Sequence, residues 1–383
     1  MRYNVDERQQ PIRDAVREFA EKEIVPVAQE LDRRPEPQAF PHDYYKKLAD
    51  QGYIGFPMPK EYGGQGRSSI EYTTLCEELS YWDAPSNLLS AVAVLALEPI
   101  AMYASEEQKK KYIPKAISGE ILPAFALTEP NAGSDAANQS TVAKVDGDDY
   151  LITGEKIFIM HGDVADTFVV FGKMEDSEAR GKISAWIVED NGNGSIRKET
   201  LKYKMGMKAA TTGRLWFDNV RVPKENLLGE PNKGFRYAMG TLDSARIGVA
   251  AQGVGIAQRA LDESIEYAKN RQAFGAPIAK LQAIQWMIAD MQVRVEAARG
   301  LTYRSAVKKD AGEKYSLDAS MAKLYATEIA RFCVDRAMQI HAGYGYIGEF
   351  SVIEKLYRDQ RIMEIYEGTS EVQRLVIANT LLR

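Results

Sequence analysis

One carboxylate near the C-terminus stands in a setting suited to proton transfer. Glu367 lies between an aromatic residue and a glycine in the segment 365–370, which reads Ile-Tyr-Glu-Gly-Thr-Ser. The glycine permits backbone angles and a close ligand approach that a side chain would block. A glutamate at such a break in helical structure can point into a cavity and act as a general base. The same residues also fit an ordinary helix end, with Thr369 or Ser370 capping the next helix, so the segment alone leaves both interpretations open.

The composition is that of a globular protein and argues against a nucleic-acid binder. The chain has 383 residues, of which 27% are charged and 45% hydrophobic, and its net charge is −5. This length allows two or three domains, and the basic patch of a nucleic-acid binder is not expected. Cys76 and Cys333 lie far apart in helical patterns and are expected to be buried thiols in a reducing compartment. With three histidines in the chain, we expect no metal site.

The sequence also predicts where the protein resides. No uninterrupted apolar run approaches the roughly 18 residues that a membrane helix needs. Residues 1–17 are charged and lack the apolar centre of a secretion signal. We therefore expect no membrane span and a cytoplasmic location.

Helical periodicity dominates the first third of the chain. Apolar residues recur at the helical period over residues 8–30, 43–51, 68–80 and 88–103. The last segment is apolar on nearly every side from Leu88 to Leu97, which is typical of a buried helix or of a cavity wall.

The pattern changes to strands and then back to helices. Short runs rich in β-branched and aromatic residues at 149–159, 167–173, 183–189 and 214–219, separated by turns, predict an antiparallel β-domain. Long helical segments follow at 235–271, 281–311, 318–343 and 352–364, and their short connections predict a four-helix bundle. The expected fold is mostly α with a central β-domain. It comprises an N-terminal helical domain (1–121), a middle antiparallel β-domain (122–228) and a C-terminal four-helix bundle (229–383).

Three further loops place polar or charged side chains beside glycines. Residues 128–135 (Thr-Glu-Pro-Asn-Ala-Gly-Ser-Asp) either present hydroxyls and N–H groups to a polar ligand or form an irregular turn. Arg271 follows a long helix, where its guanidinium can pair with helix-end carbonyls or with a phosphate. Residues 339–346 form a second glycine-punctuated helix end that matches no phosphate-binding fingerprint. His341 in that segment is interpreted as a helix-end hydrogen-bonding group.

Taken together, the ordered motifs resemble the acyl-CoA dehydrogenase family of flavoproteins. TEPNAGSD from Thr128, NRQAFG from Asn270 and IYEGTSEVQR from Ile365 occur in the order and near the spacing of that family. The resemblance covers essentially the whole chain and implies the same three domains, FAD as cofactor and an acyl-CoA substrate. It implies removal of an α proton and a β hydride from the thioester, a homotetramer, and electron-transfer flavoprotein as electron acceptor.

The resemblance also assigns roles to individual residues. It makes Glu367 the base, because the alternative family position on the helix around Arg246 reads Ser-Ala-Arg-Ile-Gly-Val at 244–249 and offers no carboxylate. Arg271 and Phe274 would reach the FAD of a neighbouring subunit. The implied FAD-binding residues are Phe125, Leu127, Thr128, Phe158, Met160, Arg271, Phe274, Gln282, Gln339, Gly343, Thr369 and Glu371. The implied acyl-CoA contacts are Ser134, Leu242, Asp243, Arg246, Tyr366 and Gly368.

The chain departs from the family pattern beside the flavin. The usual Trp-Ile-Thr/Ser-Asn stretch reads Phe-Ile-Met-His at 158–161, so Met160 lacks the hydroxyl that bonds the flavin nitrogen. This leaves the redox potential and the substrate open. A second stretch, 348–354, is about one residue longer than usual and lacks its proline.

We expect an FAD-dependent dehydrogenase of a short- or medium-chain acyl-CoA, with branched and cyclic acyl groups included. Segment 84–97 carries no Arg or Lys, so a dicarboxylic acyl group lacks a counter-ion there. Three alternatives stay open: an enoyl-CoA reductase running the reverse reaction, an acyl-CoA oxidase, and a non-catalytic scaffold of the same fold.

Overall fold

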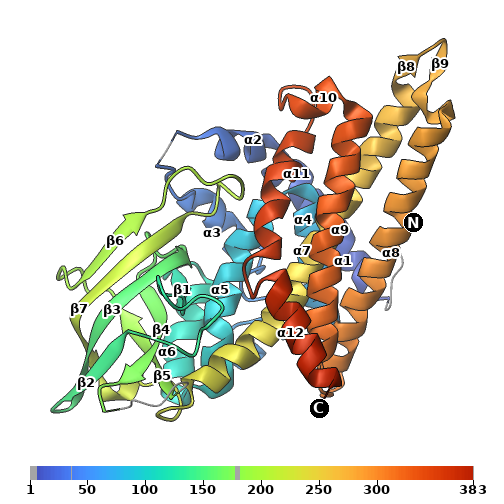
Figure 1. Ribbon diagram of the computed structural model, residues 1–383. Helices are drawn as coiled ribbons and strands as arrows, with labels where there is room; N and C mark the ends of the chain where they lie inside the picture. The colour runs from blue at the N-terminus through green and yellow to red at the C-terminus, as the bar shows by residue number, and fades with distance from the viewer. Residues whose placement is uncertain (1–6, 36, 177–181, 383) are drawn as a thin grey trace.

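The first third of the chain is helical in the computed structural model, which describes residues 7–35, 37–176 and 182–382 (Figure 1). A π-helical turn breaks the helix predicted over 8–30 into three pieces. Capping side chains fix where two of the helices begin. Ser68 and Glu71 form a capping box before the helix α4 (Ser69–Trp82), and the Asp83 side chain accepts from the N–H of Ser86 at the start of α5 (Ala84–Tyr103). The elements are α1 (Gln9–Phe19), η1 (Ala20–Ile24), α2 (Val25–Arg33), α3 (His42–Asp50), η2 (Lys60–Tyr62), α4 (Ser69–Trp82), α5 (Ala84–Tyr103) and α6 (Glu106–Ile117).

Helix α5 is the apolar centre of this helical part. Among the described residues it alone is long and apolar enough to cross a membrane, by length and composition, and 67% of its apolar window is buried inside the protein. It packs against α4, α6, β1 and α7. A helix that is apolar on every side belongs in a core, so its packing accounts for its composition.

The middle of the chain forms a mixed sheet of seven strands in the order β1-β4-β2-β3-β7-β6, with β5 paired to β4. The predicted strands at 149–159, 167–173, 183–189 and 214–219 are all present. Three shorter strands that the sequence did not single out join them. The elements are β1 (Pro123–Ala126), β2 (Val142–Asp146), β3 (Asp149–Met160), β4 (Thr167–Met174), β5 (Ile183–Glu189), β6 (Ile196–Thr200), β7 (Thr212–Pro223) and the 3-10 turn η3 (Lys224–Asn226).

The sheet differs in one respect from the antiparallel prediction. Strand β4 runs parallel to both β1 and β2, while the other pairs are antiparallel. The β2–β3 hairpin separates β1 from β4 in sequence, and such a crossover connection allows parallel pairing. Alternation of side chains reports which faces are buried but says nothing about the direction of a distant partner.

The last third is a helical bundle beside the sheet. Figure 1 shows α7, α8 and α9 as long columns, with α12 at the end nearest the C-terminus. The fourth predicted helix, 352–364, is a short α-helix followed by a 3-10 helix, and the helix after Glu367 packs on α9. The elements are α7 (Gly234–Asn270), β8 (Gln272–Ala273), β9 (Ala276–Pro277), η4 (Ile278–Lys280), α8 (Gln282–Asp310), α9 (Ser316–His341), α10 (Gly343–Tyr346), α11 (Ile353–Asp359), η5 (Gln360–Glu364) and α12 (Ser370–Leu381).

One buried ammonium group joins the three parts of the chain. Lys355 on α11 donates to Asp83 at the start of α5 (2.7 Å) and to Asp359 (2.6 Å). Asp359 also accepts from the backbone N–H of Met207, in the loop before β7, at 2.5 Å. Burial raises the pKa of Asp359, and the Lys355 ammonium opposes that rise. The first helices, the sheet and the segment leading to Glu367 are therefore tied together at one point.

Candidate active site

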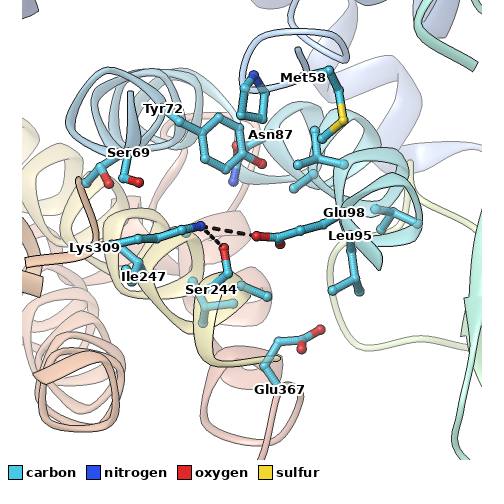
Figure 2. Close-up of a pocket in the computed structure, with 18 of the residues that line it drawn as sticks. Met58, Ser69, Tyr72, Asn87, Leu95, Glu98, Ser244, Ile247, Lys309 and Glu367 are labelled. Atoms are coloured by element: carbon cyan, nitrogen blue, oxygen red, sulfur yellow. Dashed lines mark hydrogen bonds and ion pairs between the residues drawn. The ribbon is translucent and has the colours of Figure 1, made fainter. Parts of the chain in front are cut away.

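A cavity of about 390 Å³ lies where α4, α5 and α7 meet the segment before α12. This volume falls within the range of ligand pockets. Most of its wall is apolar, with Leu88, Val92 and Leu95 from α5 and Ile247 from α7. Figure 2 shows the carboxylate of Glu367 facing this space from one side. The cavity thus combines an apolar wall with one carboxylate from the predicted segment.

The backbone at Glu367 is held in an unusual conformation. Its φ is +54° and that of Gly368 is +93°, and a left-handed non-glycine residue costs about 1–3 kcal/mol. The Glu367 carbonyl accepts from Arg246 Nε and from Gln373 Nε2, each at 3.2 Å. The Gly368 carbonyl accepts from Lys323 Nζ at 2.7 Å and from Gln373 Nε2 at 2.9 Å. Side chains from α7, α9 and α12 therefore fix this peptide.

Glycine is required at position 368. Its φ lies in the region that side chains disfavour, and a Cβ there would meet Gln373 Nε2 at 2.7 Å. Since Gln373 is the amide that holds both carbonyls, any larger residue would displace the contact that fixes Glu367.

The electrostatic setting makes Glu367 a base that works near neutral pH. Burial raises its pKa to about 7, Arg246 and Lys323 oppose the rise, and Glu98 adds to it. Carboxylate Oε2 is buried and has no hydrogen-bond partner among the described residues. A carboxyl group whose pKa is near the working pH can both accept and release a proton, as general acid–base chemistry requires.

Tyr366 anchors the same segment to α5. Its hydroxyl donates to Gln252 Oε1, and Gln252 Nε2 donates to the carbonyl of Ala84 at 3.3 Å. Tyr366 and Gln252 both line the cavity. The aromatic residue beside Glu367 is therefore part of the cavity wall.

The end of β3 brings Met160 to the same cavity. Its sulfur accepts from the Thr212 hydroxyl at 3.1 Å. Phe158 sits at a break in the β3–β7 register, with φ of +59° and 65% of its surface exposed. His161, by contrast, is fully buried against Phe40, with a ring separation of 5.0 Å, and does not line the cavity.

Models of one known protein family match nearly the whole length of the chain. The family models "Acyl-CoA dehydrogenase, N-terminal domain", "middle domain" and "C-terminal domain" match residues 6–120, 124–220 and 232–382. The chain belongs to the acyl-CoA dehydrogenase family. Its members are FAD-dependent oxidoreductases, so the predicted class of enzyme, its fold and its cofactor are confirmed.

Individual members of the family are similar along the whole chain. A 3-(aryl)acrylate reductase from Clostridium sporogenes is 46% identical, with 98% of this chain and 99% of that protein covered. A short-chain specific acyl-CoA dehydrogenase from Clostridium acetobutylicum is 44% identical over 100% of both chains. A chain in a structure described as an electron transferring flavoprotein of Acidaminococcus fermentans superposes with a TM-score of 0.95 at 42% identity, covering 100% of both.

The residues beside the cavity fit the FAD that acyl-CoA dehydrogenases use. The exposed ring of Phe158 offers a flat apolar surface next to Met160. At the start of α12, Thr369 caps the helix by accepting from the N–H of Val372, and Ser370 Oγ is buried without a partner among the described residues. An exposed aromatic ring and one unpaired hydroxyl, that of Ser370, suit a flavin ring and its polar chain. Glu371 lies in the same first turn.

Three predicted FAD-binding residues lie on β1 and in the loop after it. Phe125 is buried against Phe171, with ring centroids 4.9 Å apart, and Thr128 is half-buried. The carbonyl of Leu127 accepts from Lys156 Nζ at 3.1 Å. The same buried ammonium pairs with Glu129 at 2.7 Å and so holds the 128–135 loop in place.

Five other predicted FAD-binding residues lie at the opposite end of the bundle, where Figure 1 shows β8, β9 and α10. All five are exposed in the single chain, and the structure does not bring them near Glu367. Phe274 is 95% exposed, and the Arg271 guanidinium lies 5.4 Å from the ring centre of Tyr344. The five residues are Arg271, Phe274, Gln282, Gln339 and Gly343.

The predicted acyl-CoA contacts fall into two places. Leu242 is half-buried, and Arg246 pairs with Asp243 at 2.5 Å on the stretch of α7 where the cavity-lining residues Ser244 and Ala245 stand. Ser134 is exposed in the loop after β1. Arg246 therefore joins this group to the peptide of Glu367, whereas Ser134 lies on a separate surface loop.

Sequence reasoning missed the residues that position the base. Lys323 and Gln373 are fully buried; Lys323 donates to the carbonyl of Gly368, and Gln373 donates to that of Glu367. The available signal for Lys323 was a lone lysine among the small apolar residues of a bundle helix. Such a lysine is rarely buried without a specific partner, so its position alone could have indicated a functional role.

Proposed function

We propose that the protein oxidises a short- or medium-chain acyl-CoA to the 2-enoyl-CoA, with Glu367 as the general base. The observation that carries this proposal is the carboxylate of Glu367, whose pKa burial raises to about 7, in the same cavity as Met160 at the end of β3. The α proton of a thioester is weakly acidic, so a desolvated carboxylate and stabilisation of the enolate are both needed.

The other carboxylates that line the cavity are engaged elsewhere. Glu98 pairs with Lys309 at 3.1 Å. Asp310 accepts from the backbone N–H groups of Ser69 (2.7 Å) and Ile70 (3.1 Å). Among the described lining residues, Glu367 is therefore the carboxylate best placed to take the proton.

The fixed peptide at Glu367 serves the reaction in a second way. The thioester carbonyl would accept from the N–H of Glu367 while the side chain of the same residue removes the α proton. Arg246, Lys323 and Gln373 hold this segment, so the donor and the base keep one relative position. Such preorganised donors stabilise developing negative charge most effectively. FAD, when bound, supplies the acceptor for the hydride of the β carbon.

The remaining site assignments form part of the proposal. Phe125, Leu127, Thr128, Phe158, Met160, Thr369 and Glu371 would hold the flavin side of FAD within one subunit. The five exposed residues at the opposite end of the bundle would contact the FAD of a neighbouring subunit in a homotetramer. Their exposure in the single chain supports this assignment. Tyr366 and Gly368 would contact the acyl end of the substrate. The CoA arm would be contacted by Ser134, Leu242, Asp243 and Arg246.

The change from helices to strands at β1, and back to helices at α7, supports three domains over residues 1–121, 122–228 and 229–383.

A second candidate is the reverse reaction, reduction of an enoyl-CoA. Met160 has no hydroxyl to donate to the flavin, and its sulfur already accepts from Thr212. Loss of that hydrogen bond would alter the flavin potential and hence the favoured direction. The Clostridium sporogenes relative is named a reductase, which supports this candidate.

Electron-transfer flavoprotein is the proposed electron partner, because the similar Acidaminococcus fermentans structure is described as one of an electron transferring flavoprotein.

An anaerobic titration of the FAD-loaded enzyme with a panel of saturated acyl-CoAs tests the main proposal. We expect short- and medium-chain members to bleach the flavin, and their 2-enoyl products to perturb its spectrum without bleaching. Rapid reoxidation of the bleached enzyme by oxygen would indicate an oxidase. If no acyl-CoA bleached the flavin, the proposed dehydrogenation would be refuted.

A further inference from the structure

The cavity carries a second polar group far from Glu367. Figure 2 shows Glu367 on one side and Asn87, Tyr72 and Met58 on the other, with Lys309 and Glu98 between them in this view. Asn87 lies in the first turns of α5, whose later residues form the apolar wall. The reacting end and this second end therefore belong to one continuous space.

The side-chain oxygen of Asn87 lacks a partner. Asn87 is only 3% exposed, and its Oδ1 is buried without a hydrogen bond among the described residues. Buried amide oxygens are nearly always paired, because leaving one unpaired costs free energy. Asn87 lines the cavity together with the apolar Leu88 and Val92, so a ligand in the cavity is the available donor.

The charges of the cavity indicate that this donor is neutral. Two cations line it, and each already has a carboxylate partner among the described residues: Arg67 with Glu71 at 3.0 Å and Lys309 with Glu98 at 3.1 Å. Lys309 also contacts the Ser244 hydroxyl. An acyl group ending in a carboxylate would find no unpaired cation among the lining residues that the structure describes. A cationic group would lack a free carboxylate at that end.

We propose that the acyl group of the substrate carries a neutral hydroxyl at its far end, and that Asn87 selects it by accepting that hydrogen bond. A hydroxyl supplies the donor that the Asn87 oxygen lacks, and its carbon skeleton packs on the apolar wall of α5. Alkyl and aryl groups with a terminal hydroxyl share this chemistry. The inference rests on the proposed acyl-CoA function and narrows its substrate class.

Two substrate pairs that differ by one hydroxyl test the inference. They are hexanoyl-CoA with ω-hydroxyhexanoyl-CoA, and phenylpropanoyl-CoA with its para-hydroxy derivative. The readouts are the rate of flavin bleaching and the Kd of each thioester for the holoenzyme. We expect the hydroxylated member of at least one pair to be preferred by roughly tenfold in kcat/KM, the size of one well-made hydrogen bond. The pair with the larger preference for its hydroxylated member shows whether the acyl group is alkyl or aryl.

The variant Asn87→Leu keeps the branched outline of the side chain but removes the acceptor, and should abolish the preference by weakening the hydroxylated member most. Leu95→Met, on the same wall, is the matched control and should leave the ratio unchanged. A wild-type enzyme that does not prefer the hydroxylated member of either pair would overturn the inference, without needing any variant. An unchanged ratio in Asn87→Leu would do the same. Bleaching by the unsubstituted acyl-CoAs in either case would leave the proposed dehydrogenation intact, so the two failures are distinct.

Discussion

Replacing Glu367 by glutamine should separate catalysis from stability. The pKa of Glu367 is about 7 in the folded protein, against an ordinary value of 4.5. Because the folded state keeps a proton that the unfolded chain has already lost, stability falls as the pH rises from about 4.5 to about 7. Glutamine does not titrate, so Glu367→Gln escapes this loss. From the shift, the variant gains about 3 kcal/mol over the wild type at pH 8, but only about 1 kcal/mol at pH 5.

The measurement is urea unfolding of both proteins at pH 5 and pH 8, followed by circular dichroism. Glu371→Gln, four residues further on at the exposed start of α12, is the control. The pKa of Glu371 is lowered rather than raised, so this control should show no gain at high pH. Equal effects of Glu367→Gln at the two pH values would show that Glu367 is not held in a desolvated site.

The same variant should lose the reaction while keeping its ligands. Glutamine preserves the shape and the backbone N–H of residue 367 but cannot accept the α proton. Removing a positioned base slows bleaching roughly a hundred- to ten-thousand-fold, whereas acyl-CoA should still perturb the flavin spectrum. Bleaching near the wild-type rate would show that another residue takes the proton.

Three further changes probe the surroundings of the base and of the cofactor. Arg271→Ala removes a charged partner of a phosphate, a loss of about 1.5–3 kcal/mol; the variant should release FAD on dilution, and full retention would contradict the assigned contact. Met160→Thr should restore a flavin hydrogen bond worth about 0.5–1.5 kcal/mol and shift the reduction potential without loss of FAD; an unchanged potential would place residue 160 away from the flavin. Lys323→Met removes a cation that lowers the pKa of Glu367, so the rise of kcat/KM should move to higher pH, whereas Lys323→Arg should keep the wild-type profile. A profile that stays in place in Lys323→Met would mean that Lys323 supports the fold alone.

Much of the fold could be predicted because its elements are long and periodic. The helix predicted over 235–271 is α7 (Gly234–Asn270), and the strand predicted over 183–189 is β5 (Ile183–Glu189). The π-helical turn η1 could not be predicted, because the apolar positions of 8–30 stay near the helical period through it. The parallel pairing of β4 was equally hidden, since a strand's own residues do not identify its neighbours.

The part of the site formed by residues adjacent in sequence could be predicted. The contacts made by residues from distant segments of the chain could not. Glu367 was found from its own segment, with a glycine beside it and family motifs around it. Lys323 reaches the Gly368 carbonyl from a different helix, and no local pattern connects the two. Asn87 stood in an apolar helix without any sign that its amide oxygen would be left unpaired in a cavity.

The contacts of Lys355 limit how this protein can be recombined with its relatives. Its ammonium bonds Asp83 and Asp359, and Asp359 in turn accepts from the N–H of Met207. A chimera that imports only the first helices must bring a carboxylate of matching reach, or it leaves a buried charge short of one partner. A graft of the sheet must likewise preserve the backbone course at Met207. New substrate ranges should therefore come more readily from point changes along α5 than from exchange of whole segments.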